Sequence, residues 1–228
     1  MESEVDGILV AAHELKAPLA LIRQLAFSFD GLNQENENIR TEMIAVSERA
    51  IKQVNDLSKV RRLEDGLFEM EPVSIRAVCD EVSHELGQLF SYNEKTLYKK
   101  YSNHSKLVTA NHDLLYSVIY NFLLNALHYS DKETQAKLLI KDNKGYVKVV
   151  VRDYGPTLPV DIWRELKRGW VEKPVSIAMR PGSSGLGLYI ASKFSKYMNA
   201  EVGAVRHRDG VSFYVKIPVP RQLSMWGV

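Results

Sequence analysis

This sequence has only one cysteine and no large excess of either charge. Its single cysteine, Cys79, cannot form an intramolecular disulfide and has no partner for a cysteine-based zinc site, which fits a reducing compartment. Thirty Lys and Arg against 28 Asp and Glu leave a net charge of +2. Such a balance is too near neutral to indicate a nucleic-acid-binding or acidic-lipid-binding protein as a whole. We therefore expect no nucleic-acid partner.

Long hydrophobic runs are also missing. The longest apolar stretch, from Leu114 to Tyr129, is too short to cross a bilayer and carries Asn121, Asn125 and His128, so it predicts a core helix. No basic segment followed by an apolar one opens the chain, which argues against a secretory signal. We expect no membrane span in this chain and a cytoplasmic location, either alone or as the cytoplasmic core of a larger, membrane-linked sensor.

The first third of the chain reads as two long helices. Apolar residues recur at steps of three and four from Ser3 to about Phe29, and again from the turn at residues 30–33 to about Leu63. Two long helices joined by a short turn form an antiparallel hairpin. A hairpin alone is thin, and a second copy would bury its apolar stripes best. The pattern thus predicts a homodimeric four-helix bundle built from residues 1–66.

A second domain, residues 67–228, follows a linker around Asp65 to Pro72, where the helical periodicity stops. Helices are expected at Ala77–Phe90, His112–Tyr129 and Leu186–Met198. Strands are expected at Thr96–Tyr101, Lys106–Thr109, Lys137–Lys141, Tyr146–Arg152, Glu201–Arg206 and Val211–Ile217. The last two are expected to be joined by a turn at Arg208-Asp209-Gly210. Helices interleaved with a mostly antiparallel sheet predict an α/β sandwich, so the fold class is α+β.

The first segment with chemical potential is His13-Glu14, in the first predicted helix. A histidine beside a carboxylate, away from the apolar stripe, could act as a nucleophile, although a surface histidine is the simpler interpretation. A His-Glu-x-x-His zinc site is disfavoured because Ala17 stands where the second histidine is needed. Pro18 removes a helical hydrogen bond and would loosen the turn beside His13.

The second segment is the series Asn121, Asn125 and His128, spaced i, i+4, i+7 on one stripe of an apolar helix. A solvated helix face would explain this stripe. Asparagine is a mediocre helix former, however, and its carbonyl oxygen suits Mg²⁺ whose remaining positions are filled by phosphates and water.

The third segment is Asp153-Tyr154-Gly155-Pro156, directly after an apolar strand. A carboxylate at a strand end can accept a hydrogen bond from an exocyclic amine, and a glycine lets the backbone approach a flat ring. An ordinary turn is the alternative interpretation.

The fourth segment, residues 182–188, places glycines before a helix, where backbone N–H groups form a phosphate site. It lacks the Gly-Lys-Ser/Thr ending of a P-loop and does not follow a strand as a Rossmann fingerprint does. A flexible hinge is the alternative.

Taken in chain order, the four segments resemble those of the histidine protein kinases of two-component signalling, over essentially the whole chain. Residues 13–19 look like the H box of that family, 121–126 its N box, 153–156 its G1 box and 185–188 its G2 box. The resemblance implies a dimerisation and histidine-phosphotransfer hairpin followed by an ATP-binding domain of the gyrase, Hsp90 and MutL type.

The resemblance also implies roles. His13 would accept the phosphoryl group, with Glu14 as the base or orienting carboxylate, and Asn125 together with Asn121 would hold Mg²⁺. Asp153 would take the adenine amino group. The residues implied to contact ATP are Asn121, Asn125, His128, Tyr129, Asp153, Gly155, Ser184, Gly185, Leu186, Gly187 and Leu188. The phosphoryl group would then pass to an aspartate on the receiver domain of a response regulator.

Some positions depart from the family pattern. Ala17 replaces a Thr or Asn that orients water, which implies weak phosphatase activity toward the phosphorylated regulator. Thr157 replaces the closing glycine of the G1 box, His128 stands where Lys or Arg is frequent, and the aromatic lid motif is reduced to residues 162–166. Charged residues of the stretch that follows, Arg168, Lys173 and Arg180, are candidates for phosphate contacts or for plain solvation.

The leading hypothesis is an ATP-dependent kinase that phosphorylates its own histidine, and two alternatives to it remain. The departures are the reason for the first alternative, a degenerate kinase that dimerises and docks a partner without catalysis. An ATPase of the same superfamily that acts on DNA or client proteins is disfavoured by the hairpin and the near-neutral charge.

Overall fold

The computed structural model describes residues 19–27, 34–102, 107–160, 163–164 and 186–219. The chain divides into two compact units, Met1–Leu67 and Phe68–Val228, and the boundary lies one residue from the expected 66/67. No described helix is long and apolar enough to cross a membrane.

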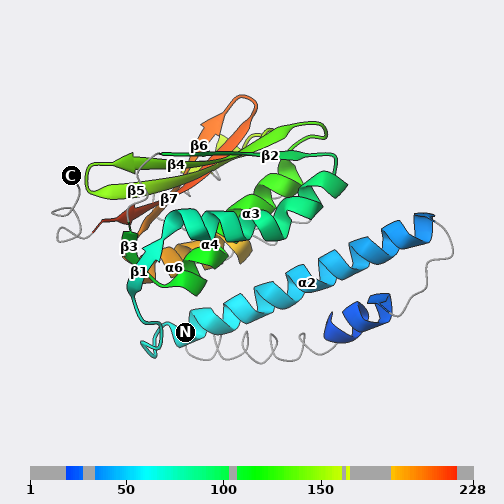
Figure 1. The fold of residues 1–228 in the computed structure, drawn as a ribbon, viewed down its shortest axis with the longest axis horizontal. Coiled ribbons are helices and arrows are strands. Elements are labelled where there is room, and N and C mark those ends of the chain that lie inside the picture. The colour runs from blue at the N-terminus through cyan, green and yellow to red at the C-terminus, as the bar shows by residue number, and fades with distance from the viewer. Residues whose placement is uncertain (1–18, 28–33, 103–106, 161–162, 165–185, 220–228) are drawn as a thin grey trace. The chain divides into compact units, whose positions relative to one another are not determined.

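The first unit is helical where it is described. Residues 19–27 form one helical segment and α2 spans Gln34–Arg62 (Figure 1). Arg40 of α2 donates from Nε to the Ala26 carbonyl at 3.0 Å and from Nη2 to the Phe27 carbonyl at 3.4 Å. Ala26 and Phe27 are the last two described residues of that helical segment. Arg40 therefore ties the start of α2 to the preceding helical segment.

The second unit contains α3 (Ile75–Tyr92), α4 (His112–Tyr129) and α6 (Leu186–Tyr197). Two of these helices begin at capping residues. The Ser74 hydroxyl accepts from the Ala77 N–H, and the Asn111 side chain accepts from the Leu114 N–H. The expected α4 has its observed bounds, whereas α3 begins two residues earlier than expected, directly after its Ser74 cap.

The described part of this unit contains seven strands, and five of them form its main sheet. They are β1 (Glu71–Ser74), β2 (Thr96–Tyr101), β3 (Leu107–Ala110), β4 (Gln135–Asn143), β5 (Tyr146–Arg152), β6 (Glu201–His207) and β7 (Gly210–Pro218). The order in the main sheet is β2-β4-β5-β7-β6. β2 and β4 are parallel and the other pairs antiparallel, as expected for a mostly antiparallel sheet.

Helices α3, α4 and α6 lie on one face of this sheet (Figure 1). Alternate residues of the strands are buried against them, as the two-residue period of a strand requires. Phe122 of α4 and Phe213 of β7 stack in this core, with ring centroids 5.7 Å apart. The predicted α/β sandwich is thus confirmed.

One prediction about the linker is wrong. Glu71 and Pro72, assigned to it from the sequence, are part of β1, which pairs antiparallel with β3. A four-residue strand that contains a proline has almost no periodic signal, and only its partner, over 30 residues later in the chain, stabilises it. The chain just before β1 is anchored as well, because the Tyr197 hydroxyl donates to the Phe68 carbonyl at 3.1 Å.

Candidate functional site

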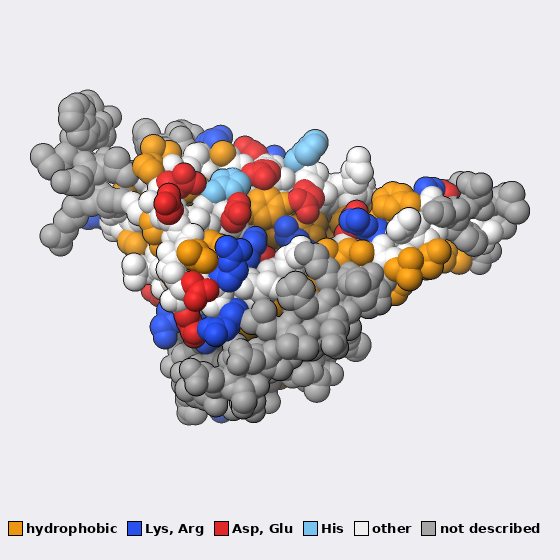
Figure 2. Space-filling model, turned by 90° about the horizontal axis from the view of Figure 1, so that it is seen from below, with side chains coloured by type: hydrophobic (Ala, Val, Ile, Leu, Met, Phe, Trp, Pro, Cys, Tyr) orange, Lys and Arg blue, Asp and Glu red, His pale blue; other side chains and the backbone are white. Residues whose placement is uncertain are grey.

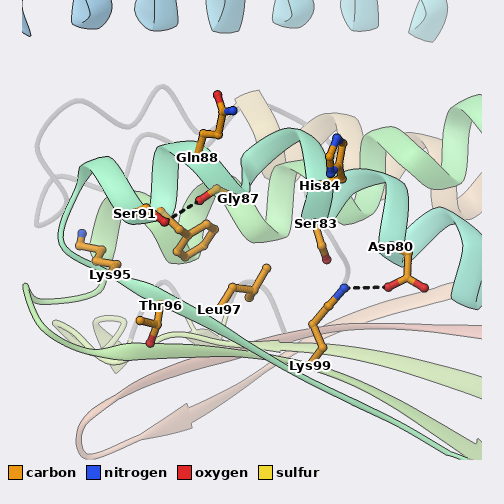
Figure 3. A pocket seen from close by; sticks show the side chains of 11 residues that line it. Asp80, Ser83, His84, Gly87, Gln88, Ser91, Lys95, Thr96, Leu97 and Lys99 are labelled. Atoms are coloured by element: carbon orange, nitrogen blue, oxygen red, sulfur yellow. Dashed lines mark hydrogen bonds and ion pairs between the residues drawn. The ribbon is translucent and has the colours of Figure 1, made fainter.

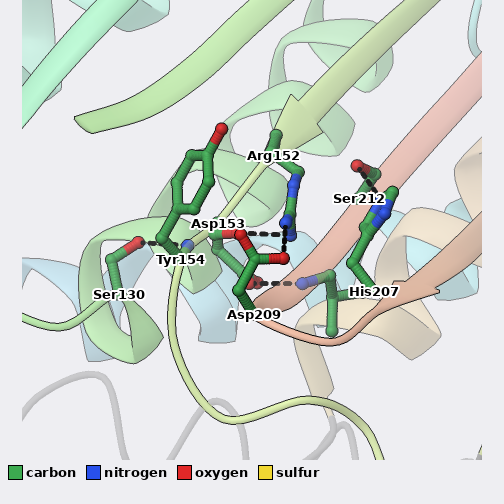
Figure 4. Close-up of polar contacts among 8 residues, drawn as sticks. Ser130, Arg152, Asp153, Tyr154, His207, Asp209 and Ser212 are labelled. Atoms are coloured by element: carbon green, nitrogen blue, oxygen red, sulfur yellow. Dashed lines mark hydrogen bonds and ion pairs between the residues drawn. The ribbon is translucent and has the colours of Figure 1, made fainter. Parts of the chain in front are cut away.

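Asp153 lies directly after β5, where β5 and β7 are paired (Figure 4). Its backbone N–H donates to the Val211 carbonyl at 2.9 Å, and its Oδ1 accepts from the Val211 N–H at 2.6 Å. The residue is 1% exposed. The backbone of β7 therefore fixes the carboxylate in one orientation, which is the preorganisation that recognition of an amine by a carboxylate needs.

The turn before β7 supports Asp153 in a way that sequence reasoning missed. Gly210 has φ +135°, and a Cβ placed on it would lie 2.3 Å from the Asp153 carbonyl oxygen and 2.7 Å from Oδ1. Arg152 donates to the Asp153 carbonyl at 2.6 Å and forms an ion pair with Asp209 at 2.5 Å. The sequence showed only the turn residues Arg208, Asp209 and Gly210, and their contact with Asp153 depends on strand pairing.

His207 is the titratable neighbour of this turn. Its ring lies 2.9 Å from the Ser212 hydroxyl. Burial, and then the positive charge of Arg152, lower the pKa of His207 below its ordinary value near 6.5. The lowered pKa favours the neutral imidazole at pH 7.

The segment after Asp153 is held against the end of α4. The Tyr154 N–H donates to the Ser130 hydroxyl at 3.2 Å, and the Asp131 N–H donates to the Tyr154 carbonyl at 2.7 Å. A Cβ on Gly155 would lie 1.7 Å from the Tyr129 carbonyl oxygen. A glycine is thus required at position 155, because no side chain fits between these two backbones.

Replacing Gly155 by alanine is expected to lower the free energy of unfolding by about 2 kcal/mol or more, because two backbone segments must separate. The matched control is Gly87→Ala in α3, where an added Cβ meets nothing within 4 Å. Alanine favours a helix over glycine by about 1 kcal/mol, so this variant should gain stability. Thermal unfolding of both variants measures the difference, and equal melting temperatures would contradict the argument.

The three polar residues of the α4 stripe, Asn121, Asn125 and His128, differ in how exposed they are. Asn121 is 4% exposed, and its Nδ2 donates to the Ser117 carbonyl at 2.8 Å. Asn125 is half-buried, and His128 is exposed. The alternative of a solvated helix face is therefore wrong for Asn121, whereas it describes His128 well.

Gly187, in the first turn of α6, approaches Asn121 closely. A Cβ added to Gly187 would lie 2.7 Å from Asn121 Oδ1. The two residues are 66 positions apart, and the packing of α4 against α6 brings them together. One residue of the second sequence motif therefore meets one of the fourth, and the buried Asn121 amide oxygen faces Gly187.

The other predicted residues divide between described and undescribed parts of the chain. His13, Glu14, Ser184 and Gly185 lie outside the described residues, as do Ala17, Pro18 and most of the expected lid. Among those described, Leu186 begins α6 and Leu188 is 6% exposed in the core. The Thr157 hydroxyl, at the departure from the third motif, is buried with no hydrogen-bond partner among the described residues.

A separate cavity of about 740 Å³ lies between α3 and β2 (Figure 3). Its lining includes His84, Lys95 and Lys99, and Lys99 forms an ion pair with Asp80 at 2.9 Å. None of the motif residues lines it. The candidate site is therefore the region around α4, the end of β5 and the start of α6, and not this cavity.

The residues of that region fit a nucleotide and a hard cation. Amide oxygens such as those of Asn121 and Asn125 are suitable ligands for Mg²⁺. Helix starts such as that of α6 favour phosphate, because their first backbone N–H groups have no partner within the helix. The described residues contain no cluster of three or more His, Cys, Asp or Glu that could hold a metal alone. A cation here would need phosphate and water as further ligands.

The comparisons with known proteins agree with this geometry. Residues 110–221 match the family model described as "Histidine kinase-, DNA gyrase B-, and HSP90-like ATPase". Hybrid signal transduction histidine kinase K of Dictyostelium discoideum is 24% identical over 96% of this chain and 20% of its own length. The probable sensor histidine kinase TcrY of Mycobacterium tuberculosis is 26% identical over 92% of this chain and 44% of its own length. The chain thus spans less than half of either relative.

Solved structures show the same fold. The catalytic domain of histidine kinase ThkA aligns with a TM-score of 0.58 at 19% identity and covers 68% of this chain and 99% of that structure. Full-length ShkA in complex with AMPPNP aligns with a TM-score of 0.64 at 20% identity, over 94% of this chain and 46% of that structure.

Proposed function

Because residues 110–221 match the family model of histidine kinase-, DNA gyrase B- and HSP90-like ATPases, in a chain similar to sensor histidine kinases, we propose that this protein is an ATP-dependent histidine kinase. It phosphorylates its own His13 and passes the phosphoryl group to an aspartate of a response regulator. The observation that carries the proposal is the contact of Gly187 with Asn121. This contact places Asn121, a potential cation ligand, beside the start of α6, where backbone N–H groups could bind phosphate.

We infer different parts for the two asparagines, because they differ in exposure. Asn125 is the more exposed of the two and is the proposed Mg²⁺ ligand. Asn121 is buried, and its amide nitrogen donates to the Ser117 carbonyl of its own helix. Its amide oxygen lies against Gly187, so Asn121 positions the start of α6 and supplies a second, less accessible oxygen for the cation. Bound Mg²⁺ would neutralise phosphate charge during transfer.

The chain's own residues supply the remaining steps. Asp153, fixed by Val211, accepts a hydrogen bond from the adenine amino group. Glu14 holds the His13 imidazole so that one ring nitrogen is unprotonated and nucleophilic. A nitrogen–phosphorus bond forms as the bond from the γ-phosphorus to the leaving ADP oxygen breaks, and the ring proton remains with the imidazole or passes to Glu14.

The reaction can be tested with ATP labelled in its γ-phosphate. Incubation of the full chain with labelled ATP and Mg²⁺ should produce acid-labile, base-stable label on the protein. A folded dimer that binds ATP but takes up no label would instead support the second candidate, a docking module without catalysis. The buried Thr157 hydroxyl, where the family has glycine, is the observation that favours this second candidate.

Exposed apolar side chains on the helices of the first unit support the proposal that the protein dimerises. Ile39, Met43 and Val46 follow i, i+4, i+7 spacing on α2 and are 42–49% exposed. Leu21, Leu25 and other apolar residues of the preceding helical segment are exposed too. Figure 2 shows hydrophobic side chains at the surface of this unit. Apolar stripes of this kind are buried when two hairpins pair as a four-helix bundle.

A glutamate in place of Met43 is expected to weaken the dimer at least about tenfold, because a charge would be buried in the bundle. Glu48→Lys is the control, since position 48 is exposed on the opposite side of α2 from this stripe. Sedimentation equilibrium across a concentration series measures both constants. A dimer of unchanged affinity in the Met43→Glu variant would show that another surface pairs the chains.

A further inference from the structure

The face of the main sheet that is opposite the helices is strongly basic. Along each strand, the residues that alternate with the buried core point to this second face. Of the outward positions on the five strands, one carries an acid, Glu201. Six carry a cation, namely Lys100, Lys137, Lys141, Lys148, Arg152 and Lys216, and together these six residues define the cationic face.

Three lysines of the cationic face stand directly opposite one another. Lys141 of β4 pairs in register with Lys148 of β5, and Lys148 pairs with Lys216 of β7. Neighbouring strands are about 4.8 Å apart, so these ammonium groups form a row across the sheet. Like charges placed opposite each other destabilise a sheet. The row is therefore an arrangement that a bound anion would stabilise.

Only part of this charge is neutralised within the described residues. Lys216 forms an ion pair with Glu201 at 2.7 Å, and Arg152 with Asp209 at 2.5 Å. Lys100, Lys137, Lys141 and Lys148 have no ion pair with any described carboxylate. Burial, and then the charges of Lys216 and Lys141, lower the pKa of Lys148. The uncompensated charge thus gathers over β2, β4 and β5.

Two tyrosine rings on this face, those of Tyr214 and Tyr154, are covered by cations, whereas Tyr98 of β2 is 42% exposed. Lys148 Nζ lies 3.8 Å from the centroid of the Tyr214 ring, and the phenol end of that ring fills the place of a Cβ on Gly203. Lys137 and Arg152 both lie over the Tyr154 ring, at 5.1 and 4.5 Å. Single-stranded nucleic acids bind sheets by stacking bases on open aromatic rings. Tyr98 is one such ring, but most of this face presents ammonium groups, which suit individual carboxylates.

We propose that the cationic face docks an acidic segment of a partner protein, with carboxylates meeting Lys141 and Lys148. A protein segment can place its charges on these lysines and avoid Glu201, whereas a uniformly anionic bilayer would also repel that carboxylate. A bilayer is disfavoured further because Val205 is the one large aliphatic side chain among the exposed hydrophobics of this face. Five strands span roughly 19 Å, which gives a small, salt-sensitive interface.

The test uses the full chain and labelled poly-L-glutamate of roughly 20 residues, followed by fluorescence anisotropy at low and moderate salt. The double variant K141E/K148E should lower the affinity at least about tenfold, and K141Q/K148Q should give an intermediate loss. The control K132E/K196E changes the charge equally at exposed lysines off this face and should stay within about threefold of the natural chain.

The proposal is overturned if the control K132E/K196E loses as much affinity for poly-L-glutamate as K141E/K148E does. It is also overturned if the natural chain does not bind poly-L-glutamate. Tighter binding of a single-stranded DNA or of phosphatidylglycerol vesicles, lost in K141E/K148E, would assign the face to a nucleic acid or a membrane instead. Nucleotide binding should persist in both variants, because these lysines lie outside the proposed ATP site. The result is therefore independent of whether the chain is an active kinase.

Discussion

Replacing His13 by alanine is expected to abolish labelling of the protein by γ-labelled ATP, with a loss of at least about 100-fold. Alanine offers no nitrogen to form a bond with phosphorus. ATP affinity should be unchanged, because the nucleotide contacts proposed here come from residues of the second unit. Labelling is followed after gel separation, and ATP binding by isothermal titration calorimetry.

His84→Ala is the matched control for this variant. His84 is an exposed histidine of α3 that lines the separate cavity between α3 and β2. It should keep full labelling. If the His13 variant still accepts phosphate while the His84 variant does not, the nucleophile has been assigned to the wrong histidine.

Replacing Asp153 by asparagine is expected to weaken ATP binding by about 2–3 kcal/mol, or roughly 30- to 150-fold. The amide has nearly the shape of the carboxylate and can still accept from the Val211 N–H, so the fold should persist. It loses the negative charge, and it has one oxygen where the carboxylate has two. An adenine amino group then meets a weaker or misdirected acceptor. Titration with ATP measures the affinity, and circular dichroism checks the fold.

Asp209→Asn separates this effect from a change in local charge. Asp209 is exposed and contacts Arg152, which in turn donates to the Asp153 carbonyl. Its loss removes one surface ion pair, and we expect less than about a threefold change in ATP affinity. Equal weakening in both variants would mean that the charge of the turn matters and that Asp153 does not contact adenine.

Local pattern predicted three elements of the second unit to the residue. The α4 helix and strands β2 and β5 have the bounds expected from sequence, although most of α4 is buried and no residue of β2 is. The β1 strand escaped prediction. Its four residues gain their structure from pairing with β3, which is remote in the chain.

The residues of the candidate site were likewise only partly predictable from the sequence. Sequence spacing identified Asn121, Asp153, Gly155 and Gly187 as residues of unusual type for their places. It treated Gly210 as part of a simple turn, although that glycine has φ +135° and leaves room for the Asp153 carboxylate. Nothing in the local sequence around residue 210 indicates this contact, since it depends on the register between β5 and β7.

By itself, the sequence determined the helices, most strands and the order of the four motifs, because these depend on side-chain types at short spacing. Only the tertiary structure distinguished buried Asn121 from the more accessible Asn125, and joined Gly187 to the former. It alone also aligned Lys141, Lys148 and Lys216 in one row. These are contacts between segments far apart in the chain, and their free energy comes from packing and strand register rather than from local preference.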